Sequence, residues 1–406
     1  MLTIALLLAA VALLSLAFAD KALRVLPLTP AVLYLCIGAA AGSAVGAPSM
    51  QSLATYAVPI RVALELALLV SLFAIGLRLR IAPTWRAWRV ALLLAGPAML
   101  VTISVVAAAA VWGYGWSWGL ALVVASILAP TDPVLASEVQ VHSAHDRDEL
   151  RLSLTAEGAM NDGTALPAIV IGLWLLASAG GPAELDGWTA LAWPVFGGAA
   201  IGVALGYALG MVIHARVRAG DALARDELLL LGGVTLSYGV ALASGTSAFV
   251  LGFAVAVTLL QPLRRDTLTP SELPLAERLH AFGSRIERLV EALSVVAVGI
   301  ALFIVPPTLQ MLVLALVLLL AARPLAVLLT VPPTWVSSHQ RGLLAWFGIR
   351  GVGSLYYLAY SLEHGLNAEN ASLMVGTVMT ALAASIVLHG LSVTRLMDSY
   401  KQRRGR

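Results

Sequence analysis

The chain has 406 residues, of which 60% are hydrophobic (Ala, Val, Ile, Leu, Met, Phe, Trp, Tyr or Cys) and only 12% are charged. Soluble domains usually contain about 25% charged residues. The composition therefore excludes a soluble globular protein and predicts an all-α polytopic membrane protein. The 25 basic and 22 acidic side chains nearly cancel and give no indication of a nucleic-acid partner. A single cysteine, Cys36, excludes an internal disulfide framework.

A bilayer core of about 30 Å is crossed by a helix of about 20 apolar residues. Thirteen stretches meet this requirement, so we expect thirteen transmembrane helices in a single domain over residues 1–406. The stretches cover 2–19, 27–45, 57–77, 90–112, 116–139, 150–178, 189–213, 226–243, 246–262, 290–306, 309–331, 341–361 and 371–396.

The basic residues test this count, because cytoplasmic loops of membrane proteins are enriched in Lys and Arg. All but three of the 25 fall in loops after odd-numbered spans or at the C-terminal end, and loops after even-numbered spans hold none. This pattern predicts a multi-pass protein of the cytoplasmic (inner) membrane, with the N-terminus outside and the C-terminus inside. The exceptions are Arg61, Arg323 and Arg350, which lie within predicted spans.

The first span has an alternative interpretation as a cleaved signal peptide, because Ala17-Phe18-Ala19 is similar to a cleavage site. Cleavage would leave Lys21 and Arg24 outside, against the charge pattern. We therefore favour a first transmembrane helix.

The longest polar stretch, 263–289, has apolar residues at helical spacing, among them Leu279, Phe282 and Ile286. This spacing predicts an amphipathic helix that lies on the cytoplasmic surface and joins two spans. A regulatory role for this segment is the alternative.

Thirteen spans also allow inverted repeats, which are common in transporters. Residues roughly 1–179 would correspond to roughly 224–397, with a linker helix at roughly 189–215. The repeats would pair span 5 with span 12, and both are interrupted, which is the strongest indication of a binding site that sequence offers.

The linker helix carries Gly198, Gly202, Gly206 and Gly210 at a spacing of four. Small residues let helices approach closely. We expect this stripe to pack against a helix of the same chain, with a dimer contact as the alternative.

Ionisable side chains at membrane depth are costly and therefore mark functional sites. The predicted spans place six of them at depth: Glu65, Asp132, Glu157, Asp162, Arg323 and Arg350. We expect Glu157 to pair with Arg350 as a structural ion pair. Arg323 would pair with Glu65 or Glu291, and the sequence does not choose between them.

Span 5 contains Pro130-Thr131-Asp132-Pro133. Because each proline lacks an amide donor, we expect the helix to break into two halves here. Asp132 before a proline also fits the cap of the second half, and the sequence leaves open whether it caps that half or contacts an ion. Thr131 can offer its hydroxyl group or its freed carbonyl group to a cation.

Span 6 contains Glu157 and, one helical turn later, Asn161 and Asp162. Two carboxylates, an amide and a nearby threonine provide hard oxygen ligands, which suit Na⁺. The predicted ion-binding residues are Asp162, Glu157, Thr131, Asn161 and Asp132, with Na⁺ itself at Asp162, Glu157 and Thr131. The lack of His and Cys in this cluster argues against zinc chemistry.

Three motifs, Ala129 to Pro133, Glu157 to Asp162 and Gly348-Ile349-Arg350-Gly351, resemble those of bacterial NhaP-type sodium/proton exchangers, which are monovalent cation:proton antiporters. Ser385 to Gly390 and Phe73 to Leu79 also fit, so the resemblance covers nearly the whole chain. It implies the sodium/proton antiporter fold, with two crossed, interrupted helices, usually as a homodimer and without a cofactor.

The resemblance also implies residue roles. Asp162 would carry either Na⁺ or H⁺, and Asn161 before it would mark the electroneutral branch. Thr131 and Glu157 match ion-site positions, and Arg350 matches the arginine that pairs with the glutamate. Gly158 and Ala74 depart from the serine and the acidic residue that many relatives have, which leaves the choice of cation open.

We therefore predict a secondary active antiporter with a role in pH homeostasis, not an enzyme, which exchanges Na⁺ or Li⁺ for H⁺ at one competitive carboxylate site. K⁺/H⁺ exchange is the nearest alternative, followed by a proton-coupled carrier for an organic substrate. An intramembrane aspartyl protease using Asp132 and Asp162 lacks its Gly-x-Gly-Asp context.

Overall fold

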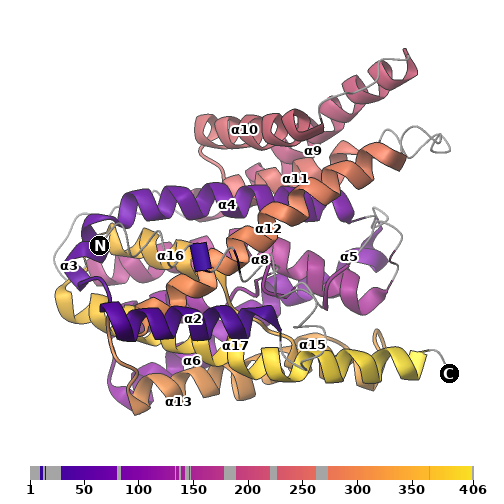
Figure 1. The fold of residues 1–406 in the computed structure, drawn as a ribbon. Coiled ribbons are helices and arrows are strands. Elements are labelled where there is room, and N and C mark those ends of the chain that lie inside the picture. The colour runs from indigo at the N-terminus through magenta and orange to yellow at the C-terminus, as the bar shows by residue number, and fades with distance from the viewer. Residues whose placement is uncertain are drawn as a thin grey trace.

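Apolar stretches of the chain form helices, as the composition predicts, and a computed structural model shows how they pack (Figure 1). The structure describes residues 29–79, 84–132, 134–136, 139–141, 146, 148–177, 189–219, 226–261, 273–364 and 366–404, together with residues 10, 11 and 14. Within these ranges there is no β-strand. The predicted first span, 2–19, lies almost entirely outside the described residues.

The described helices follow the remaining predicted spans in order. They are α2 (Pro30–Val45), α3 (Met50–Thr55), α4 (Ala57–Arg78), α5 (Trp85–Leu93), the π-helical segment η1 (Leu94–Ala98), α6 (Met99–Tyr114), α7 (Trp118–Leu128), α8 (Glu149–Ala177), α9 (Thr189–Arg218), α10 (Asp226–Ser244), α11 (Ala248–Leu259), α12 (Leu273–Ala301), α13 (Leu309–Val317), the π-helical segment η4 (Leu318–Ala322), α14 (Arg323–Thr330), α15 (Ser338–Trp346), α16 (Val352–Leu362) and α17 (Ala368–Arg404).

Six of the described helices or continuous helical runs are long and apolar enough to cross a membrane, and four shorter apolar helices accompany them. In Figure 1, α9, α10 and α11 lie along one edge of the bundle, and α13 and α17 lie along the opposite edge. The C-terminus lies at the end of the bundle opposite α3 (Figure 1).

Both spans that the sequence predicts to be interrupted are interrupted. α7 ends at Leu128 and is followed by non-helical residues 129–132, and α15 and α16 are separated by the non-helical segment 347–351. The amide of Asp132 donates a hydrogen bond of 2.7 Å to the carbonyl oxygen of Ile349. The two breaks therefore meet and form a crossing.

The stripe of glycines in α9 packs against α11 of the same chain. A methyl group added at Gly202 would lie 2.5 Å from the carbonyl oxygen of Leu251, and one at Gly206 would collide with the backbone of Val255. The prediction of packing within the chain is confirmed for these positions.

Replacing Gly202 by Ala should therefore lower the stability of the protein. Overpacking typically costs about 1–3 kcal/mol, and here the obstacle is backbone. Gly232→Ala in α10 is the matched control, because a methyl group there meets nothing within 4 Å. Thermal unfolding in detergent should show a lower Tm for G202A and no loss for G232A. Equal Tm values for the two variants would contradict this packing.

The prediction of a helix is confirmed for residues 273–289, but the prediction that it is a separate helix joining two spans is wrong. These residues belong to α12, which continues without a break to Ala301 and crosses the bundle diagonally (Figure 1). The physical reason is contact with α4. Gly283 abuts Ala74, and Arg78 forms an ion pair with Glu287 at 2.5 Å. Residues 263–272 lie outside the described residues.

Candidate functional site

Asp132 caps both chain breaks at the crossing. Its Oδ1 accepts hydrogen bonds from the amides of Val134 (2.6 Å) and Leu135 (3.2 Å). Its Oδ2 accepts from the amide of Val352, the first residue of α16. A carboxylate at a helix N-terminus is stabilised by the helix dipole. Of the two roles that the sequence leaves open for Asp132, this geometry supports the cap.

Arg350 contacts the C-terminal end of a half-helix at the crossing, whereas Asp132 contacts an N-terminal end. The guanidinium of Arg350 donates to the carbonyl oxygen of Ala129, directly after the C-terminus of α7. A cation there complements the negative end of that half-helix. The side chain is fully buried, and its Nε and Nη2 atoms have no hydrogen-bond partner among the described residues.

Asp162 on α8 is a buried carboxylate without a charged partner among the described residues. It is 1% exposed, and neither carboxylate oxygen has a hydrogen-bond partner in the described parts of the chain. Gly353, near the start of α16, makes room for it, because a methyl group at this position would collide with Oδ1 of Asp162. A buried carboxylate in this state requires a proton or a cation, because an isolated buried charge is very costly.

Asn161 and Thr131 meet beside Asp162, as predicted. The amide nitrogen of Asn161 donates a hydrogen bond of 2.8 Å to the hydroxyl oxygen of Thr131. This contact leaves the Oδ1 atom of Asn161 buried and without a partner among the described residues. The amide oxygen and the Asp162 carboxylate are therefore available to a ligand.

The predicted pair of Glu157 with Arg350 is wrong. Arg323 holds both oxygens of Glu157, at 2.5 and 2.9 Å, and also donates to the carbonyl oxygen of Phe347 at 3.3 Å. Glu157 and Arg323 are 1% and 3% exposed. The guanidinium of Arg350 is instead directed at the end of α7, so the bidentate pair forms with Arg323. Both oxygens of Glu157 are thus engaged by a protein cation.

The expected partners of Arg323, Glu65 or Glu291, are therefore also wrong. Arg61 bonds Glu65 at 2.8 Å and Glu363 at 2.8 Å, and the hydroxyl group of Tyr238 donates to Glu65 at 3.4 Å. This cluster joins α4 to the end of α16. The structure does not bring Glu65 into the crossing.

Tyr357 is a residue at the site that sequence reasoning missed. Its hydroxyl group donates to the backbone carbonyl oxygen of Asp162, and the ring is almost fully buried. The available signal was a tyrosine in the apolar half of span 12 that follows the glycine-rich interruption.

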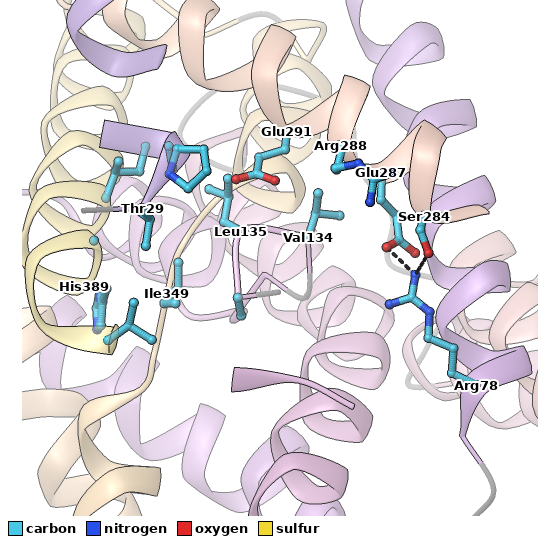
Figure 2. A pocket seen from close by; sticks show the side chains of 16 residues that line it. Thr29, Arg78, Val134, Leu135, Ser284, Glu287, Arg288, Glu291, Ile349 and His389 are labelled. Atoms are coloured by element: carbon cyan, nitrogen blue, oxygen red, sulfur yellow. Dashed lines mark hydrogen bonds and ion pairs between the residues drawn. The ribbon is translucent and has the colours of Figure 1, made fainter. Parts of the chain in front are cut away.

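A cavity of about 410 Å³ lies beside the crossing. Its walls come from α2, α4 and α12 on one side, and from Val134 to Ala136, Ile349 and α17 on the other. Figure 2 shows Arg78 with its partners Ser284 and Glu287 across the cavity from Ile349 and His389. The cavity is thus lined by charged side chains on one side and by residues of the crossing on the other.

The chain is similar to known proteins over most of its length. The family model for the transmembrane sodium/hydrogen exchanger matches residues 7–398. The K(+)/H(+) antiporter NhaP of Alkalimonas amylolytica is 26% identical over 336 residues, which is 81% of this chain but 56% of that protein. The chain thus spans just over half the length of this relative.

Solved structures confirm the fold. The sodium proton antiporter MjNhaP1 of Methanocaldococcus jannaschii at pH 8 superposes with a TM-score of 0.72 at 18% identity, covering 97% of this chain and 98% of the other. A second structure of MjNhaP1, from electron microscopy, gives a TM-score of 0.73 at 19% identity, with 98% and 97% covered. Because the family model covers nearly the whole chain and the fold agrees, this protein belongs to the sodium/hydrogen exchanger family.

Proposed function

We propose that the protein is a secondary active antiporter that exchanges Na⁺ or Li⁺ for H⁺ across the cytoplasmic membrane. The observation that carries this proposal is Asp162, a buried carboxylate without a partner for either oxygen among the described residues. One negative charge of this kind can be neutralised by one monovalent cation or one proton. The two ions therefore compete for the same group.

The cation is the substrate, and the proposed ligands are hard oxygen atoms. The two carboxylate oxygens of Asp162 and Oδ1 of Asn161 are unpartnered among the described residues, and Thr131 adjoins them. Such ligands suit Na⁺ and similar ions. Glu157 and Asp132 are held by Arg323 and by backbone amides. We propose that these two shape the site and do not release their partners to bind the ion.

We propose alternating access, in which the site moves between the two sides of the membrane only when Asp162 is neutralised by an ion. A charged, unpaired Asp162 would be expensive to carry through the membrane interior, whereas the neutralised site moves freely. One neutralising ion in each direction gives 1:1, electroneutral exchange. The membrane potential then does no net work on the cycle.

The cavity beside the crossing is the proposed route from one side. It is lined by Arg78 and Arg288, which the distribution of basic residues assigns to the cytoplasmic face. Under that assignment the N-terminus is outside, the C-terminus is inside and the structure is open to the cytoplasm.

We also propose inverted repeats and a homodimer. The repeats are supported by the two interrupted spans and by the π-helical segments η1 and η4, which lie in spans that the repeats would pair. The homodimer rests on resemblance to the family.

K⁺/H⁺ exchange is the second candidate, because the relative from Alkalimonas amylolytica is a K(+)/H(+) antiporter. The structural relative MjNhaP1 is a sodium proton antiporter. Ala74, at a position where many relatives of the family carry an acid, is consistent with altered selectivity.

The test is exchange in proteoliposomes with a lumenal pH dye and a panel of Li⁺, Na⁺, K⁺ and Rb⁺. We expect an outward gradient of Na⁺ or Li⁺ to acidify the lumen, with the same rate when the membrane potential is clamped at zero. A response to K⁺ alone would select the second candidate. No cation-dependent change, with the protein folded and reconstituted, would refute antiport.

A further inference from the structure

His389 is a buried histidine that the proposed mechanism does not use. It lies on α17, is 3% exposed and lines the cavity beside the crossing (Figure 2). Its Nε2 atom is 3.0 Å from the carbonyl oxygen of Trp346, the last residue of α15. A carbonyl oxygen only accepts hydrogen bonds, and we assign the proton of the neutral ring to Nε2 on the basis of this contact.

The other ring nitrogen has two possible partners on Ser385. Nδ1 is 3.2 Å from the hydroxyl oxygen of Ser385 and 2.8 Å from its carbonyl oxygen. In the neutral ring, Nδ1 accepts a hydrogen bond from the hydroxyl group. In the charged ring, Nδ1 donates to the carbonyl oxygen. Because an unprotonated Nδ1 and the Ser385 carbonyl oxygen are both acceptors, the 2.8 Å contact suits the charged ring, and the neutral ring relies on the hydroxyl group at 3.2 Å. The two protonation states therefore differ in what the hydroxyl group of Ser385 does.

That hydroxyl group is connected to the crossing. Ser385 Oγ accepts a hydrogen bond of 3.0 Å from the amide of Arg350. The neutral ring therefore completes a chain of hydrogen bonds from Arg350 through Ser385 to His389, and aligned hydrogen bonds strengthen one another. The charged ring breaks this alignment. Through Trp346 and Arg350, His389 holds both ends of the non-helical segment 347–351.

Charged groups face His389 from several elements. Arg350 and Arg323 approach from the segment 347–351 and from α14 and oppose a charge on the ring, whereas the C-terminal end of α15 favours it. Across the cavity lie Glu287, Arg288 and Glu291 of α12 and Arg78 of α4. The ring therefore faces charged groups of both signs, and it borders the cavity, through which its proton can exchange.

We propose that His389 is a positioning residue for the crossing, and that exchange of its proton with the cavity switches the Ser385 hydrogen bonds that hold segment 347–351. This proposal rests on the proposed function. It makes the rate of exchange depend on pH on the cavity side through a group separate from Asp162.

The first test compares pH profiles of exchange for His389→Gln and the parent, with pH varied on the cavity side. Glutamine keeps a donor and an acceptor but does not titrate. We expect the midpoint of the profile to move by about one pH unit, the usual spread of histidine titration in proteins. His364→Gln is the control, because this histidine is exposed and its ring contacts only Tyr360 among the described residues, through the carbonyl oxygen and the ring of that tyrosine. Unchanged profiles in both variants would overturn the proposal.

A second readout does not need transport. The difference in Tm between the parent and His389→Gln should vary with pH over the same range, and a constant difference would overturn the proposal.

If H389Q does not fold, Ser385→Ala replaces it. Loss of the hydroxyl donor destabilises the neutral ring, so the midpoint should move to higher pH, and an unmoved midpoint would count against the switch. A parent that shows pH-linked stability but no exchange would refute the antiport function alone.

Discussion

Replacing Asp162 by Asn should reduce cation-dependent proton exchange to the level of protein-free liposomes. Asparagine has nearly the same shape but carries neither a proton nor a charge at neutral pH, so the ions lose the group for which they compete. The same change removes an uncompensated buried charge, which is costly in the folded state. We therefore expect the Tm to stay equal or to rise while transport is lost.

This opposite effect on folding and transport makes the test specific. The matched control is Asp398→Asn, the same chemical change at a side chain that is 59% exposed near the end of α17. D398N should retain both exchange and Tm. The assay is the lumenal pH dye in proteoliposomes under a Na⁺ gradient. Sodium-dependent pH change persisting in D162N would remove Asp162 from the mechanism.

Much of the site could be predicted from the sequence because the relevant information is local. Pro130 and Pro133 break span 5 wherever that helix lies, and the glycines beside Arg350 loosen span 12. The four-residue spacing of Glu157 and Asn161 fixes their common face on α8. The resemblance to the exchanger family implies that the two interrupted spans cross, and the hydrogen bond from Asp132 to Ile349 confirms this.

The partners of the buried charges could not be predicted in this way. Arg323 and Arg350 both lie on spans that adjoin the site, and their spacing says nothing about which guanidinium reaches Glu157. That choice depends on the direction of each side chain: Arg350 points at Ala129, whereas Arg323 points at Glu157 and Phe347. The double capping by Asp132 depends in the same way on a contact with Val352, 220 residues later.

The continuity of α12 was missed for a related reason. An amphipathic pattern shows that a helix has a polar face, but it does not show what covers that face. Here the polar side chain of Glu287 meets Arg78 of α4, so this face of the helix packs against the bundle, whereas Arg285, Arg288 and Leu289 on other faces are exposed.

Breaking the pair of Glu157 with Arg323 should be the most destabilising change at the site. Removing one partner of a buried ion pair leaves the other charge uncompensated, at a cost of about 3–5 kcal/mol. Glu157→Gln and Arg323→Met should each lower the Tm strongly. The double variant E157Q/R323M should recover most of the loss, because no buried charge remains and a buried pair often contributes little net stability.

The exposed pair of Asp398 with Lys401 is the control for this cycle. Its side chains are 59% and 61% exposed and 3.9 Å apart, so its coupling should be only about 0–1 kcal/mol. Glu157 with Arg350 provides a second comparison. A coupling of Glu157 with Arg350 larger than that with Arg323, measured by thermal unfolding of E157Q/R350M, would restore the pairing expected from the sequence.

The same double variant separates stability from ion binding. If Glu157 only balances Arg323, E157Q/R323M should fold and still exchange one cation for one proton, because Asp162 remains the single group that is neutralised. If Glu157 is itself a ligand, the folded double variant should lose affinity for the cation while its Tm is restored. Measuring the cation concentration for half-maximal exchange beside the Tm therefore decides which oxygens hold the ion, and an increase in that concentration without a loss of stability would return Glu157 to the binding site.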